Sequence, residues 1–131
     1  MLVVLCSVSY TVCMNDEFGR RIRERRLSLS RKGEQYSLRQ VAVTVEVTPS
    51  FLSKVERGQL PPPSEETIKK LAAVLGENPD VLLALAGKVS SDLREVIVRR
   101  PELFGQLIRR MNDEPEVVLL RIVRELRDAK L

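Results

Sequence analysis

The stretch from Ser37 to Gly58, SLRQVAVTVEVTPSFLSKVERG, constrains the fold most, because it predicts two short helices that meet at a tight turn. Ser37 and Thr48 are suited to begin these helices, since a hydroxyl oxygen accepts a hydrogen bond from a free backbone N–H at a helix start. Pro49 follows at a first helical position, where the missing N–H of proline costs nothing. Gly58 lies where a left-handed residue ends the second helix.

Each of the two predicted helices has one apolar face, because its apolar residues recur at helical spacing. The first helix carries Leu38, Val41, Ala42 and Val45, and the second carries Leu52 and Val55. The opposite face of the second helix carries Pro49, Ser50, Phe51, Ser53, Lys54 and Arg57. A helix that is held from behind by a partner and presents short polar and basic side chains in front suits the major groove of DNA.

The excess positive charge lies on the part of the chain that contains this pair of helices. The whole sequence has 22 Lys and Arg against 18 Asp and Glu, a net charge of +4. Residues 14–60 have ten basic and six acidic residues, whereas residues 61–131 have twelve of each. A surface that binds phosphate needs such a local excess, although a basic run also occurs on ordinary solvated helix faces.

The sequence offers little to an enzyme. It contains no histidine, so histidine general bases and histidine metal ligands are excluded. Its two cysteines, Cys6 and Cys13, fit neither a zinc site nor a disulfide framework. No glycine-rich phosphate-binding loop is present. We therefore expect no catalytic activity, no cofactor and no bound metal.

The remainder of residues 14–88 predicts three more helices, and hence an all-α bundle of five. The first spans about residues 17–29 and has an apolar face of Phe18, Ile22 and Leu29. The fourth starts at Ser64, ends at Gly76 and carries Ile68, Leu71, Ala72 and Leu75. The fifth starts at Asn78 and Pro79, ends at Gly87 and carries Val81, Leu82, Leu85 and Ala86.

In this order the motifs resemble the XRE family of helix-turn-helix regulators, which includes the phage repressors and Cro-like proteins. The matching motifs are Ile22-Arg23, Arg26, Ala42, Val47-Thr48, the run from Leu52 to Gly58 and the run from Thr67 to Gly76. The resemblance covers about residues 16–87. It implies a cytoplasmic transcription regulator, a repressor that binds a pseudo-palindromic operator in double-stranded DNA as a homodimer.

The resemblance also implies roles for the side chains around the predicted turn. The base-reading positions are Pro49, Ser50, Phe51 and Lys54. Lys54 suits guanine, and Phe51 suits a thymine methyl group unless it is a core aromatic. The positions implied for phosphate contacts are Ser37, Leu38, Arg39, Thr48 and Arg57.

Two further features concern the framework of the motif. In the family, an Arg at the position of Arg26 pairs with an acid at the position of Glu56, and a planar guanidinium suits a buried carboxylate. The family usually has glycine where this chain has Glu46, so we expect a turn that is strained or differently shaped. The loop from Ser30 to Tyr36 is also longer than usual.

The two ends of the chain lie outside the resemblance. We expect residues 1–13 to be a non-native or flexible extension; a strand or an anchor is the alternative, but the segment is too short to span a bilayer. Residues 89–131 predict amphipathic helices. Their apolar faces either fold back on the bundle or cover a partner, which we expect to be a second copy. There are two other interpretations. The chain is an antitoxin whose C-terminal helices bind a toxin, or it is a pure protein-binding adaptor.

Overall fold

The computed structural model describes the backbone of residues 2–129 and the side chains of residues 16–129. The described backbone contains eight α-helices, one 3-10 helix (η1) and no strand, which confirms the all-α fold class. In chain order the elements are α1 (Leu2–Ser30), η1 (Glu34–Tyr36), α2 (Leu38–Thr44), α3 (Pro49–Glu56), α4 (Glu65–Leu75), α5 (Pro79–Leu85), α6 (Ser91–Arg99), α7 (Pro101–Asp113) and α8 (Glu116–Asp128). The chain divides between Ser90 and Ser91 into an N-terminal and a C-terminal unit.

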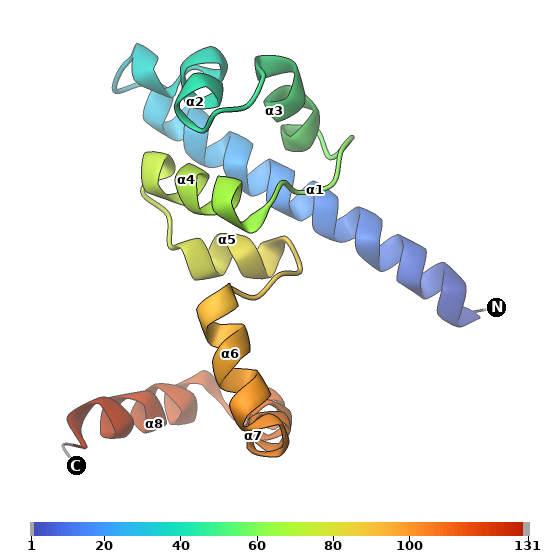
Figure 1. Ribbon diagram of the computed structural model, residues 1–131, viewed down its shortest axis with the longest axis vertical. Helices are drawn as coiled ribbons and strands as arrows, with labels where there is room; N and C mark the ends of the chain where they lie inside the picture. Colours follow the sequence, from blue (N-terminus) through green and yellow to red (C-terminus); the bar gives the residue numbers. More distant parts are fainter. Residues whose placement is uncertain (1, 130–131) are drawn as a thin grey trace. The chain divides into compact units, whose positions relative to one another are not determined.

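The N-terminal unit is built around α1, which contacts α3, α4 and α5, while α2 packs against α3 and α4 (Figure 1). The sequence predicted that this helix starts at Glu17, but in the structure it starts earlier, at Leu2. The expectation that residues 1–13 are an extension stays a prediction, because the side chains of these residues lie outside the part that the structure describes. No helix among the described residues is long and apolar enough to cross a membrane.

The two helices predicted from Ser37 to Gly58 are present with the expected starts and stop. The Ser37 hydroxyl oxygen accepts a hydrogen bond of 3.2 Å from the backbone N–H of Gln40. The Thr48 hydroxyl oxygen accepts one of 3.1 Å from the N–H of Phe51. Gly58 has a φ of 71°, so a left-handed residue follows α3 as predicted.

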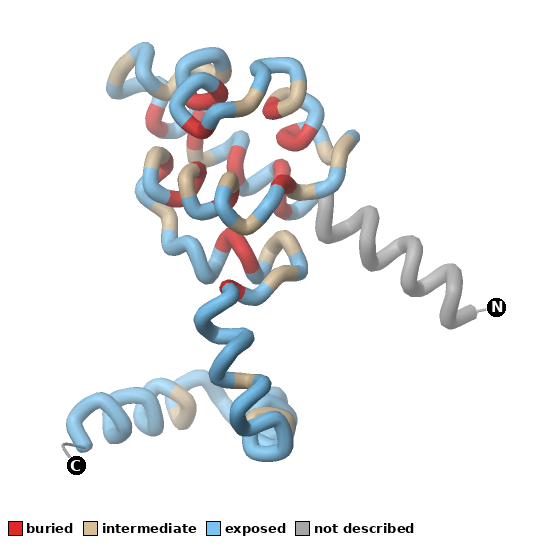
Figure 2. The backbone as a smooth tube through the Cα atoms, viewed as in Figure 1, coloured by how far each residue is buried: buried red, intermediate tan, exposed pale blue. Residues whose placement is uncertain are grey.

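The core of the N-terminal unit lies where the apolar faces of α1 to α5 meet, and Figure 2 shows the buried segments gathered there. The predicted apolar faces of α1, α3 and α4 are buried, and that of α2 is buried except for half-buried Leu38. The prediction for α5 was wrong at one of its four residues: Val81 is 42% exposed, and Leu83, which was not predicted, is buried in its place. Residues 81–83 are all apolar, so the spacing did not fix which side of this short helix faces inward.

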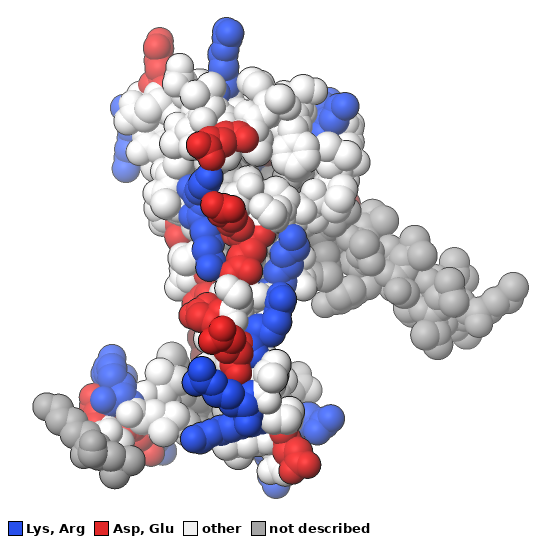
Figure 3. Space-filling model, in the orientation of Figure 1, with Lys and Arg blue, Asp and Glu red and all other residues white. Residues whose placement is uncertain are grey.

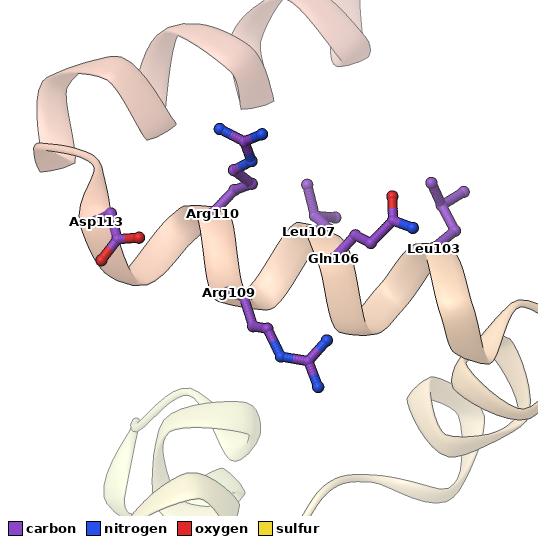
Figure 4. Close-up of a pocket in the computed structure, with 6 residues that line it drawn as sticks. All are labelled: Leu103, Gln106, Leu107, Arg109, Arg110 and Asp113. Atoms are coloured by element: carbon purple, nitrogen blue, oxygen red, sulfur yellow. The ribbon is translucent and has the colours of Figure 1, made fainter.

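The C-terminal unit consists of α6, α7 and α8, and none of its described residues is buried. The close-up in Figure 4 shows Leu103, Leu107 and Arg110 pointing to one side of α7 and Arg109 pointing to the other. Many large apolar side chains of this unit remain at least 39% exposed: Leu93, Val96, Val98, Leu103, Leu107, Ile108, Met111, Val117, Leu120, Ile122, Val123 and Leu126. The amphipathic helices expected from the sequence are therefore present, with most of their apolar surface uncovered.

Candidate nucleic-acid interface

The candidate interface is the outer face of α3 and the residues that precede it. Pro49, Ser50 and Lys54 are exposed, while Leu52 and Val55 on the opposite face are each 1% exposed. Phe51 lies between these groups: it is half-buried and packs against the core. The outer face of α3 thus presents Ser50 in its first turn and the cation of Lys54 in its last turn, and the helix is anchored by apolar packing behind this face.

A buried ion pair ties the end of α3 to α1. Arg26 Nε donates to Glu56 Oε1 over 2.7 Å, and Arg26 Nη2 donates to Glu56 Oε2 over 3.1 Å. The two residues are 9% and 7% exposed. Arg26 Nη1 also donates to the backbone carbonyl of Tyr36 over 3.5 Å, so one guanidinium links α1, η1 and α3. Such a two-pronged pair fixes direction as well as distance, and it holds α3 in one orientation on the bundle.

A close backbone approach reinforces this junction. Gly19 in α1 lies against the last turn of α3, and a Cβ atom at this position would be 2.3 Å from the carbonyl oxygen of Val55 and 2.8 Å from that of Glu56. Only a residue without a Cβ fits there without moving one of the helices. Our sequence reasoning missed Gly19, although a glycine inside a predicted helix signals close approach to another backbone.

The turn between α2 and α3 contains Glu46, which has a φ of 63°. The left-handed conformation that glycine usually supplies is therefore kept by a residue with a side chain. Lys70 Nζ lies 2.5 Å from Glu46 Oε2 and ties the turn to α4. The hydrogen bond from Lys70, followed by its positive charge, holds the pKa of the Glu46 carboxyl below its ordinary value. The same hydrogen bond raises the pKa of the Lys70 ammonium group.

The residues expected to contact phosphate lie at the starts of α2 and α3, except for Arg57, which follows the last residue of α3. Arg39 and Arg57 are exposed, and Arg57 Nε donates to the carbonyl of Ser53 over 3.3 Å. Ser37 and Leu38 are half-buried, and the oxygens of Ser37 and Thr48 serve as helix caps. Figure 3 shows Lys and Arg projecting from several sides of the N-terminal unit, with acidic residues between them. The cations can therefore contact a phosphate backbone at separate points. They do not form one continuous basic patch on the face shown in Figure 3.

The described side chains contain no group of three or more Cys, Asp or Glu residues that could hold a metal ion. Residues 17–86 form a small helical bundle in which α2 and α3 are capped at their starts and α3 is exposed along one face. This is the architecture of a helix-turn-helix domain. The chain belongs to the helix-turn-helix domain family, whose pattern matches residues 17–86.

A curated relative is similar to this chain over 79 residues at 34% identity. It is the uncharacterized HTH-type transcriptional regulator RghRB of Bacillus subtilis strain 168. The aligned region covers 60% of this chain and 53% of the relative, so the chain spans about half the length of that protein. No solved structure matches the chain.

Proposed function

We propose that this chain is a sequence-specific DNA-binding transcription regulator that places α3 in the major groove of double-stranded DNA. The proposal rests above all on the exposed first turn of α3, which is anchored by the buried pair of Arg26 and Glu56. The match of residues 17–86 to the helix-turn-helix family supports it, as does a relative that is named as an HTH-type transcriptional regulator. Within that family, the motifs favour the XRE group.

The exposed side chains divide by chemistry into base readers and phosphate contacts. Lys54 is exposed one turn into α3, and its ammonium group can donate to the O6 and N7 acceptors of guanine. Exposed Ser50 can donate to or accept from a base edge, and Pro49 adds an apolar contact. Arg39 and Arg57 supply charge for phosphate, and the backbone at Ser37, Leu38 and Thr48 supplies helix N-termini.

We propose further that the regulator is a repressor and acts as a dimer through α6 to α8. A unit of about 40 residues rarely stays folded without a partner surface, and this one buries none of its described residues. Residues 91–131 carry nine basic and eight acidic residues, so two copies would not repel each other. Two copies would place two α3 helices on half-sites about 10 bp apart, and occupancy of such a site blocks transcription.

Binding to DNA is tested first with random duplexes at increasing salt, and then by selection of tight binders from a random pool. We expect non-specific binding that weakens steeply with salt, and selection of a two-fold symmetric site. Lys54→Ala should lower the preference for the selected site by ~1–3 kcal/mol and leave random binding nearly unchanged. A protein that ignores duplexes even at low salt would refute the proposal.

Dimerisation is tested by measuring the mass of the full chain in solution. Leu107→Glu places a charge on the exposed apolar face of α7, and we expect it to yield monomers. Arg109→Glu changes the charge at an exposed residue on the opposite side of α7 and should leave the dimer intact (Figure 4). A wild-type protein that is monomeric at all concentrations would contradict the dimer. It would favour the alternative that the faces of α7 and α8 cover a partner protein, such as a toxin.

A further inference from the structure

The basic residues of the N-terminal unit divide into those that the fold uses and those that it leaves free. Several make ion pairs or donate to a backbone carbonyl and so belong to the framework. They are Arg26 with Glu56, Arg21 and Arg25 with Glu77, Lys69 with Glu65, Lys70 with Glu46, and Lys88 with the carbonyl of Pro63. Arg31 and Lys32 differ, because both are exposed and neither makes an ion pair or a side-chain hydrogen bond among the described residues. Their charges are therefore available to a partner.

These two cations lie in the connection between α1 and α2, whose backbone is held at both ends. The N–H of Lys32 donates to the Leu29 carbonyl over 2.8 Å, which closes the last turn of α1. The N–H of Ser37 donates to the Glu34 carbonyl over 2.9 Å, which closes η1, and the guanidinium described above links η1 to α1. The two charges are thus carried on a short segment with a defined place next to α2.

The same connection leads directly into the proposed DNA interface. It ends at Ser37, which caps α2, and Arg39 follows in the first turn of that helix. η1 contacts α2, and α2 contacts α3 (Figure 1). When α3 lies in the major groove, the start of α2 meets a phosphate backbone. The segment that precedes this start then meets the backbone farther from the bases that α3 reads.

We propose that Arg31 and Lys32 bind backbone phosphates on the flank of each half-site, outside the base pairs that α3 contacts. The inference rests on the proposed function, because it requires α3 to lie in the groove. Residues 31–37 contain two basic residues and one acidic residue, so the segment as a whole attracts phosphate. Phosphates are the same at every base pair, so these contacts add affinity and lengthen the site without changing which bases are read.

The test neutralises single phosphates of the DNA. A duplex carries the selected operator between constant flanks, and each flanking phosphate is replaced in turn by an uncharged methylphosphonate. For the full-length wild type, we expect the Kd to rise about two- to fivefold at one or two phosphates outside the selected base pairs. In Arg31→Gln combined with Lys32→Gln, the same replacements should leave the Kd unchanged, because the phosphate charge has lost its partners. Each ratio of Kd values is taken within one variant, so a partly unfolded sample changes both values equally.

A salt titration gives a second readout and a matched control. The Arg31 and Lys32 double variant should reduce the slope of log K against log salt concentration by about two, one for each lost phosphate contact. The control, Arg20→Gln combined with Lys69→Gln, removes the same number of charges elsewhere, since Arg20 lies beside Leu85 of α5 and Lys69 lies on α4. The control should keep the wild-type slope and the wild-type response to methylphosphonates. An equal loss of slope in the control would show that net charge alone is responsible, and would refute the inference.

The outcomes separate this inference from the proposed function. A protein that binds no duplex refutes both. A protein that binds a selected operator but responds to no flanking methylphosphonate refutes the flank contact and leaves the DNA-binding proposal standing. A response that persists at full size in the Arg31 and Lys32 double variant assigns the contact to other residues and also refutes the inference.

Discussion

Removal of Arg26 should be one of the most damaging single changes in the N-terminal unit. The guanidinium makes bonds of 2.7 and 3.1 Å to the Glu56 carboxylate, and both residues are less than a tenth exposed. Arg26→Ala would leave the charge of Glu56 with little water and no partner. Breaking a buried pair in this way costs ~3–5 kcal/mol, so we expect the free energy of unfolding to fall by that amount.

Three further variants separate the orphaned charge from other causes. Arg26→Met combined with Glu56→Met removes both charges and keeps most of the volume, and should recover most of the lost stability. Glu56→Gln keeps an acceptor for the guanidinium but leaves that charge unpaired, and should fall between the wild type and Arg26→Ala. Arg20→Ala, an exposed change on the same helix, should stay within about 0.5 kcal/mol of the wild type.

The assay must report on the N-terminal unit alone, because the two units of the chain need not unfold together. Native-state hydrogen exchange of the amides in α1 and α3 meets this need, with urea titrations as a second measure of the same free energy. If Arg26→Ala loses less than about 1 kcal/mol but binds DNA more weakly, Arg26 is a phosphate contact and the structural reasoning is refuted. A double Met variant that is no more stable than Arg26→Ala would show that the unpaired charge is not the cause.

Four further predictions have defined outcomes. Gly19→Ala gains ~1 kcal/mol in helix propensity, but it forces the backbones of α1 and α3 apart at a cost of ~1–3 kcal/mol. The free energy of unfolding measured in urea should therefore fall, and an unchanged value would show that the two helices shift freely. Glu46→Gly should be more stable than Glu46→Ala by ~1 kcal/mol, because only glycine avoids the cost of positive φ. The pKa of the Glu46 carboxyl is lowered in the folded state, so the advantage of the wild type over Lys70→Ala should be present at neutral pH. It should disappear as pH falls through that lowered pKa, which denaturation at several pH values would reveal. Arg39→Ala should weaken binding to all sequences alike and reduce the salt slope by about one, and loss confined to the selected operator would contradict this.

The helix starts were predictable because the interactions that make them are local. Ser37, Thr48 and Ser64 each cap a helix through a backbone N–H that lies three residues ahead. Gly76, likewise, ends α4 in the left-handed conformation expected of it. Such features need only a few neighbouring residues, so a single sequence contains them in full.

Features that depend on distant residues were harder to predict. Nothing near Glu46 in the sequence identifies Lys70 as the cation that holds it, and the two meet only because α4 packs behind the turn. Gly19 could be suspected of a close approach but not matched to Val55. In α5, three successive apolar residues left the buried side ambiguous until Leu83 was placed in the core. The proposed roles of Ser50 and Lys54 in reading bases stay predictions.

The same reasoning explains how the N-terminal unit would read DNA as a rigid body under the proposed function. A recognition helix transmits sequence differences as binding energy only if it cannot rotate away from a poor match. The caps of α3 fix its start, but they leave its direction free. Its direction is fixed by contacts with α1, namely the pair of Arg26 with Glu56 and the approach of Gly19 to Val55. The first residues of α3 are thus supported from its last turn, and weakening that support should lower specificity before it abolishes binding.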